Sequence, residues 1–215
     1  MKQVRKLVHR SPHRRVGYVV CTYVQPEPIE YESRLERDFV RIALLHPSIR
    51  RIVAQPTQIE IPGFGGYTPD YFLLDKNENK YIVEVKSSVF VDKYAEKLPA
   101  AKHEFDQIGM KFILTTDQQI EPRKQFAGLV HRYSQSYYSS SAIAEVIEKI
   151  HSLRLPAPIN EIVRRLGIPI ELIYYLIGHR YLQIDACNEN GLILDEKGQE
   201  NGEISIERWI GVAAR

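Results

Sequence analysis

The chain has 215 residues, of which 44% are hydrophobic and 26% are charged, as in an ordinary globular protein. This length fits one large or two small domains, and no apolar run approaches the ~20 residues that a membrane span needs. We recognise no signal peptide, and the two distant cysteines, Cys21 and Cys187, argue against a zinc site or a disulfide framework. A reducing cytoplasm is therefore the expected compartment.

The net charge of the chain is only +2, but its distribution is uneven. A basic arm precedes the first acidic residue, Glu27; besides Lys2 it contains Arg5, Lys6, Arg10, Arg14 and Arg15. Such an arm can bind the phosphates of a nucleic acid. A solvated terminus is an equally good interpretation of this feature alone.

Apolar patterns and turn residues in the first half predict an α/β domain around a mixed sheet. Leu35, Phe39 and Ile42 lie on one helical face, and Ser33 is a good N-cap for that helix. Pro56 suggests that the first strand is an edge strand or contains a bulge. In chain order we expect a helix over 33–45, a strand over 52–61, a loop over 62–66, strands over 70–74 and 80–85, a helix over 92–107 and a strand over 111–115. Pro99 marks either a break in the helix over 92–107 or the first turn of a new helix.

The second half has a different pattern, which predicts short helices and a hairpin. The serine- and tyrosine-rich segment 133–141 reads as a linker. Helices are expected over 143–150, 159–166 and 170–177, followed by strands over 181–184 and 192–194 that flank a turn at 188–191. Three helices and a hairpin suggest a winged helix-turn-helix. We therefore predict a catalytic domain over 1–138, which includes the basic arm, and an accessory domain over 139–215.

Two acidic residues and a lysine fall at matching positions of the hairpin formed by strands 70–74 and 80–85. A five-residue loop over 75–79 places Asp70 opposite Glu84, and side-chain alternation places Lys86 on the same face as Glu84. Like charges in opposite positions repel, so this pair needs a cation. Two carboxylates, a backbone carbonyl (here that of Val85) and water suit Mg²⁺, or Mn²⁺ in its place.

The same constellation contains the ingredients of phosphodiester hydrolysis. A bound metal ion makes hydroxide available at neutral pH, and the charge of Lys86 could orient the attacking water or stabilise the phosphate. Taken singly, each feature also has a structural explanation: Glu84 and Lys86 could be a surface pair, and Pro69-Asp70 could be a turn at the start of a strand.

Glu36 is the candidate third carboxylate, and it has a strong competing role. Ser33-x-x-Glu36 matches a capping box, in which Glu36 bonds back to the amide of Ser33. Glu32 is the rival carboxylate, but it precedes the expected N-cap. Glu36 lies on the helix body, and we therefore favour it as the ligand while leaving the capping role open.

These residues resemble a known family. Pro69-Asp70 followed by Glu84-x-Lys86 matches the P-D…(D/E)-x-K motif of the restriction-endonuclease-like superfamily. More closely, the chain resembles TnsA, the endonuclease subunit of heteromeric cut-and-paste transposases. The similarity covers most of residues 1–120 in order; it runs through Ser33-Arg34-Leu35-Glu36, Gln55-Pro56, Tyr67-Thr68-Pro69-Asp70, Val83-Glu84-Val85-Lys86 and Phe112-Ile113-Leu114-Thr115-Thr116-Asp117.

The resemblance implies a restriction-endonuclease-like fold, followed by a winged-helix domain, in a bacterial protein. It assigns the catalytic positions to Glu36, Asp70 and Lys86, with Glu84 as a further metal ligand. It also implies cleavage of the 5′ (non-transferred) strand at transposon ends. A TnsB-like DDE transposase would then cleave the 3′ ends, and a TnsC-like AAA+ regulator would contact the endonuclease.

The third helix of the accessory domain is a poor candidate for reading DNA sequence. Residues 171–176 contain no Lys, Arg, Asn or Gln for contact with base edges. Three lysines that follow the active strand, Lys93, Lys97 and Lys102, could face DNA or belong to a solvated helix face. Two alternatives to the transposase subunit stay open: a stand-alone restriction or repair endonuclease, and a non-catalytic winged-helix DNA-binding protein.

Overall fold

The chain is described from a computed structural model that covers residues 16–153, 155–185, 192–194 and 205–211. These residues belong to two compact units, one within 1–122 and 206–215 and the other within 123–205. The basic arm, including Arg5, Lys6, Arg10, Arg14 and Arg15, lies outside the described residues.

A four-stranded sheet forms the centre of the first unit, in the order β3-β6-β7-β8. Its strands are β3 (Ile49–Ala54), β6 (Tyr71–Asp75), β7 (Lys80–Lys86) and β8 (Lys111–Thr116). β6 runs antiparallel to both of its neighbours, β3 and β7, whereas β8 runs parallel to β7. The expected α/β class with a mixed sheet is thus confirmed.

The register of the β6–β7 hairpin is the one expected from its five-residue turn. Leu74 pairs with Lys80 and Phe72 pairs with Ile82. Asp75 stabilises the turn, because its carboxylate accepts hydrogen bonds from the backbone amides of Asn77 and Asn79, both at 2.8 Å.

The predicted strand over 52–61 was wrong in its extent. β3 ends at Ala54, and β4 (Ile59–Ile61) pairs instead with β5 (Gly65–Tyr67) in a separate two-stranded sheet. Gln55 adopts a left-handed conformation with φ of 41°, and its amide donates to the carbonyl of Asp70 at 2.8 Å. This conformation, together with the following Pro56, ends the strand.

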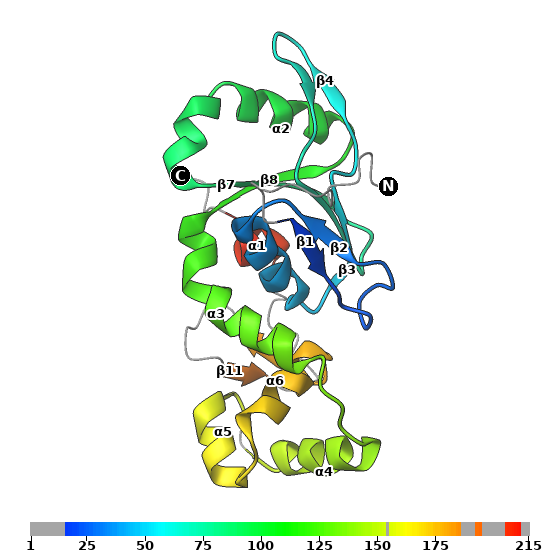
Figure 1. Cartoon of the computed structure of the whole chain (residues 1–215), viewed down its shortest axis with the longest axis vertical. Coiled ribbons are helices and arrows are strands. Elements are labelled where there is room, and N and C mark those ends of the chain that lie inside the picture. The colour runs from blue at the N-terminus through cyan, green and yellow to red at the C-terminus, as the bar shows by residue number, and fades with distance from the viewer. Residues whose placement is uncertain (1–15, 154, 186–191, 195–204, 212–215) are drawn as a thin grey trace. The chain divides into compact units, whose positions relative to one another are not determined.

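Two helices cover opposite faces of the central sheet (Figure 1). α1 (Arg34–Leu44) begins after Ser33, as predicted, and packs Phe39 against Tyr71 with ring centroids 5.3 Å apart. α2 (Lys97–Gln107) follows a 3₁₀ helix, η1 (Ser88–Tyr94), so the predicted helix over 92–107 is divided and Pro99 lies in the first turn of its second part. On the α2 side, a cluster of buried side chains contains Phe72, Ile82 and Phe105.

The short helix α7 (Ile206–Ile210) returns from the far end of the chain and packs beside α1 (Figure 1). Trp209 is buried there, and its indole Nε1 donates to the carbonyl of Ile42 at 3.0 Å. The ring of His46 packs edge-on against the indole, with centroids 5.0 Å apart. Strands β1 (Gly17–Val19) and β2 (Ile29–Tyr31) pair nearby as a small antiparallel sheet.

The second unit contains three helices, α4 (Ser140–His151), α5 (Ile159–Leu166) and α6 (Ile170–Gly178), at the predicted positions. A small antiparallel sheet has the order β10-β11-β9, with β10 (Gln183–Asp185), β11 (Leu192–Leu194) and β9 (Ala157–Pro158). The predicted pairing of the first two of these strands is confirmed. The predicted turn over 188–191 lies outside the described residues.

A long helix that the sequence patterns did not predict, α3 (Asp117–Tyr133), connects β8 to the second unit. Its apolar stripe is weak and it contains Pro122, which explains why periodicity does not reveal it. The division into compact units falls within this helix, at residues 122 and 123, and assigns residues 206–215 to the first unit. The sequence predicted this boundary at residues 138 and 139 instead, and it predicted that residues 206–215 belong to the second domain.

Candidate active site

Glu84 and Lys86 form an ion pair at the C-terminal end of β7. The ammonium nitrogen of Lys86 lies 2.5 Å from Oε1 of Glu84. Because side chains alternate along a strand, the two project on the same side of the sheet, the side covered by α2. Glu84 is 3% exposed, so this carboxylate is buried and needs partners.

Asp70 reaches the same place from the start of β6. Its Oδ2 accepts a hydrogen bond from the backbone amide of Val85 at 2.8 Å. The observed pairing of the hairpin ends at Tyr71 and Val83. Asp70 is the next residue, so its predicted position opposite Glu84 continues the observed register by one residue. Burial, followed by the negative charge of Glu84, raises the pKa of Asp70 well above its usual value of 3.8.

Lys86 lies among these negative charges and is held in the ammonium form. Burial lowers the pKa of Lys86, but the charges of Glu84 and Asp70 outweigh burial and raise the pKa above its usual value of 10.5. The ring of Tyr94 flanks the ammonium, with its centroid 5.2 Å from Nζ. A fixed positive charge therefore stands beside the two carboxylates at neutral pH.

Glu36 caps helix α1 and also contributes charge to this cluster. Its carboxylate accepts from the amide of Glu32 at 2.8 Å and from the hydroxyl of Ser33 at 2.9 Å, while Ser33 Oγ accepts from the amide of Glu36 at 3.1 Å. The capping box is thus present, with the Glu32 amide in the place expected for that of Ser33. Burial raises the pKa of Glu36, and the charge of Lys86 lowers it in part.

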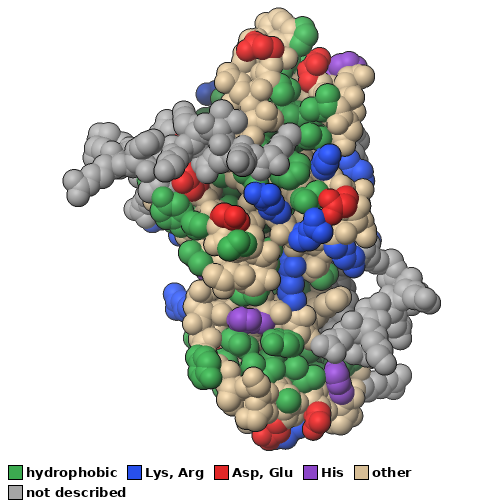
Figure 2. Space-filling model, turned by 90° about the vertical axis from the view of Figure 1, so that its right-hand side faces the viewer, with side chains coloured by type: hydrophobic (Ala, Val, Ile, Leu, Met, Phe, Trp, Pro, Cys, Tyr) green, Lys and Arg blue, Asp and Glu red, His purple; other side chains and the backbone are tan. Residues whose placement is uncertain are grey.

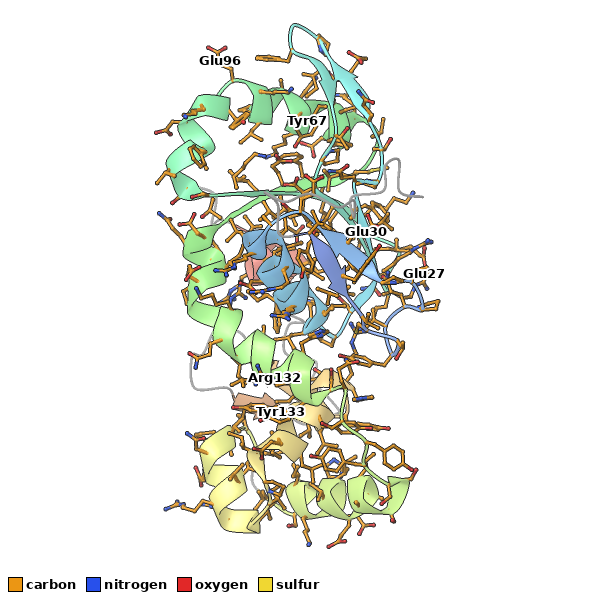
Figure 3. All side chains as sticks on the ribbon, viewed as in Figure 1. Glu27, Glu30, Tyr67, Glu96, Arg132 and Tyr133 are labelled. Carbon is orange, nitrogen blue, oxygen red and sulfur yellow. The ribbon has the colours of Figure 1, made fainter. Side chains whose placement is uncertain are left out.

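Tyr67, at the end of β5, is a member of the site to which the sequence assigned no role beyond its place in the motif Tyr67-Thr68-Pro69-Asp70. Its hydroxyl donates to Oε2 of Glu84 at 2.6 Å. The ring lies between the sheet and α2 (Figure 3), edge-on to Phe105 with centroids 6.3 Å apart. Burial and then the charge of Glu84 raise the pKa of Tyr67 far above its usual value, so the phenol stays protonated and donates. The available signal was that a buried tyrosine needs an acceptor for its hydroxyl.

Asp117 is a second residue whose role was not assigned. Its carboxylate accepts bonds from both the amide and the hydroxyl of Ser88, and these bonds fix the chain just after β7. The hydrogen bond from the Ser88 amide lowers the pKa of Asp117. Asp117 therefore links the start of α3 to the segment that leads from Lys86 into η1.

A cavity of about 220 Å³ opens beside the ion pair. It is lined by Gly66, Tyr67, Thr68, Glu84, Lys86, Tyr94, Lys97 and Leu98. Of the three lysines predicted to face DNA, only Lys97 contributes to this lining. Lys93 lies over the exposed ring of Phe90, with Nζ 4.9 Å from its centroid, and Lys102 is exposed on α2.

The face of the molecule in Figure 2 carries both basic and acidic side chains. On the face in Figure 2, Lys and Arg side chains lie among acidic and hydrophobic ones. Most of the Lys and Arg side chains visible on that face gather near its middle, with an acidic side chain among them. Any attraction of a polyanion to this face would therefore be local.

The side chains present fit a hard divalent cation that keeps part of its water shell. The described residues include no group of three or more His, Cys, Asp or Glu side chains that could hold a metal ion by themselves. Mg²⁺ does not require such a group, because it is commonly bound by one or two carboxylates plus waters. Asp70 and Glu84 supply two oxygen donors, and burial together with the charge of Glu84 raises the pKa of Asp70, so a bound cation would favour its carboxylate form.

No protein-family profile matches the chain, and no curated protein matches it in a sequence search. Among the helices that the structure describes, none is long and apolar enough to cross a membrane.

Proposed function

We propose that this chain is a metal-dependent DNA endonuclease, and that it is the TnsA-like subunit of a transposase that cleaves the 5′ (non-transferred) strand at transposon ends. The observation that carries the proposal is the convergence of Asp70, Glu84 and Lys86 at one end of β7, beside a cavity. One buried and one partly buried carboxylate can hold a divalent cation, and the neighbouring lysine can stabilise charge on a phosphate, which together suit metal-assisted phosphodiester hydrolysis.

In this proposal Asp70 and Glu84 hold the cation, with the backbone carbonyl of Val85 as a further donor. Bound Mg²⁺, or Mn²⁺, would supply Lewis-acid stabilisation of the phosphate and lower the pKa of a water molecule. Lys86 presents its ammonium to the cavity, where it can stabilise negative charge that develops on the phosphate. Glu36 adds negative charge from the N-terminal turn of α1 while it caps that helix.

The second unit supports a nuclease that is guided to its site by other proteins. We propose that this unit is a winged-helix-type domain, with α6 in the position of a recognition helix. Most of that helix is buried, including Leu172, Ile173, Leu176 and Ile177. A helix that is buried in this way has few side chains available for base edges. Site selection would then come from a TnsB-like transposase and a TnsC-like AAA+ regulator.

Strand mapping on end-labelled DNA tests the proposal. The full chain is combined with a DDE transposase and an AAA+ protein encoded next to its gene, on DNA that carries the ends of that element. The proposal expects Mg²⁺-dependent breaks in the 5′ strands that persist when the DDE transposase is catalytically inactive. Breaks confined to the 3′ strands, or 5′ breaks that form without this chain, would contradict it.

A further inference from the structure

We infer that Tyr67 is a positioning residue that orients Glu84 for binding of the divalent cation. This inference rests on the proposed function and deepens it, since it assigns to Tyr67 the control of metal affinity and metal selectivity. Tyr67 holds one oxygen of the Glu84 carboxylate, at 2.6 Å, while Lys86 holds the other, at 2.5 Å.

The two contacts fix the plane of the carboxylate and still leave it able to bind a cation. Each carboxylate oxygen has two lone pairs, so an oxygen that accepts one hydrogen bond retains a second site. The donors approach from different elements, Tyr67 from β5 and Lys86 from β7. Rotation of the Glu84 carboxylate would break at least one of these bonds, so the remaining lone pairs keep one direction.

The Tyr67 ring is itself held in place, which a positioning group requires. β5 pairs with β4, with Tyr67 opposite Ile59, and the ring packs edge-on against Phe105 of α2. The ammonium of Lys97 lies 5.6 Å from the ring centroid and completes its surroundings. Tyr67 is 7% exposed, so solvent competes little for its hydroxyl.

The chain contains a matched control for the loss of such a hydroxyl. Tyr81 is also buried, and its hydroxyl also donates to a carboxylate, Oδ2 of Asp75, at 3.1 Å. That carboxylate stabilises the hairpin turn, at the other end of β6 from Asp70. Tyr67→Phe and Tyr81→Phe therefore delete the same group in similar surroundings, but only the first deletes it beside Glu84.

Calorimetric titration of the full chain with Mg²⁺ and with Mn²⁺ tests the inference without reference to cleavage. We expect Tyr67→Phe to weaken Mg²⁺ binding by about 10- to 100-fold, the usual effect of removing a partner of a metal ligand. We expect a smaller loss for Mn²⁺, because Mg²⁺ demands the more regular ligand geometry. Tyr81→Phe should leave both affinities unchanged. Equal affinities for the wild type and Tyr67→Phe would overturn the inference.

Tryptophan fluorescence shows whether Tyr67→Phe folds, and fluorotyrosine resonances test the inference in the wild type if it does not. If Tyr67→Phe does not fold, as judged by the fluorescence of the single tryptophan, fluorotyrosine-labelled wild-type protein replaces it. The inference then expects Mg²⁺ to shift the resonance of Tyr67 and not that of Tyr81, and an unmoved Tyr67 resonance would overturn it. A wild-type chain that binds neither cation would overturn the proposed function together with this inference. Metal binding that is unaffected by Tyr67→Phe, or that leaves the Tyr67 resonance unmoved, would overturn the inference alone.

Discussion

The ammonium of Lys86 and the carboxylate of Glu84 are paired at 2.5 Å on one face of β7, and the hydroxyl of Tyr67 donates a hydrogen bond to the other oxygen of that carboxylate. Only about a quarter of the Lys86 side chain is exposed, at 25%. The lysine thus neutralises a buried carboxylate and presents its charge to a cavity at the same time. These two roles can be separated by experiment.

Lys86→Met should reduce both strand cleavage and stability. Removing the ammonium leaves Glu84 and Asp70 uncompensated, and we expect a loss of about 1–2 kcal/mol in the free energy of unfolding, less than for a fully buried pair because Lys86 is partly exposed. Added Mg²⁺ should restore much of this stability without restoring cleavage. Urea unfolding with and without Mg²⁺, beside single-turnover cleavage, measures both effects. Cleavage at the wild-type rate would contradict the role of Lys86.

Glu36 and Ser33 allow the capping role to be separated from the role in the site. Both side chains take part in the same cap, so Ser33→Ala and Glu36→Ala should each cost about 1 kcal/mol of stability. Glu36→Gln retains an acceptor and should cost less. If Glu36 also serves the site, Glu36→Gln should lower cleavage at least tenfold while Ser33→Ala does not. Equal cleavage by both variants would leave Glu36 as a cap only.

The pKa of Asp70 predicts an unusual dependence of stability on pH. A carboxyl whose pKa is higher in the folded chain than in the unfolded chain binds more protons when folded, so its contribution to stability falls as pH rises. In metal-free buffer, Asp70→Asn should therefore be more stable than the wild type at pH 7, while the amide oxygen still accepts from Val85. The two proteins should converge below pH 3.8, the usual pKa of the group.

Urea unfolding in the presence of EDTA, repeated across this pH range, checks that prediction. Mg²⁺ should then stabilise the wild type and have no effect on Asp70→Asn, because bound ligand stabilises only the form that binds it. A variant that is less stable than the wild type at pH 7 without metal would show that the Asp70 charge is already compensated.

Trp209 should contribute strongly to the stability of the first unit. Its ring is buried against α1, and replacing a buried tryptophan with alanine typically costs about 3–5 kcal/mol. On the same helix, Glu207 pairs with Lys111 at 2.6 Å on an exposed surface, so Glu207→Ala should cost less than about 1 kcal/mol. Unfolding followed by circular dichroism compares the two variants. Similar small losses would mean that α7 is not part of this core.

Local patterns predicted much of the first unit. Ser33 and the apolar stripe of α1 predicted that helix, and the five-residue turn after Leu74 predicted the hairpin register whose extension places Asp70 opposite Glu84. These features depend on residues close in sequence, where helix period and turn length are informative. The side chains of the candidate site could therefore be named before their positions were known.

Contacts between distant segments could not be predicted in this way. Tyr67 hydrogen-bonds to Glu84 because β5 and β7 come together in the fold. Trp209 hydrogen-bonds to Ile42, which lies 167 residues away in the sequence. Lys97 lines the cavity while Lys93 does not, a distinction set by the path of η1 and not by spacing. The helix α3 was missed for a different reason, since Pro122 and a weak apolar stripe hide its period.

Cleavage by the wild type and by Asp70→Asn, compared in Mg²⁺ and in EDTA, tests whether Asp70 belongs to a metal-dependent nuclease site. Every reaction contains the transposon-end DNA and the transposase and regulator proteins that we propose as the substrate and partners of this chain. We predict 5′-strand cleavage by the wild type in Mg²⁺ only, and none by Asp70→Asn, although that variant is folded. Cleavage that persists in EDTA, or that Asp70→Asn carries out at the wild-type rate, would contradict the assignment of this site.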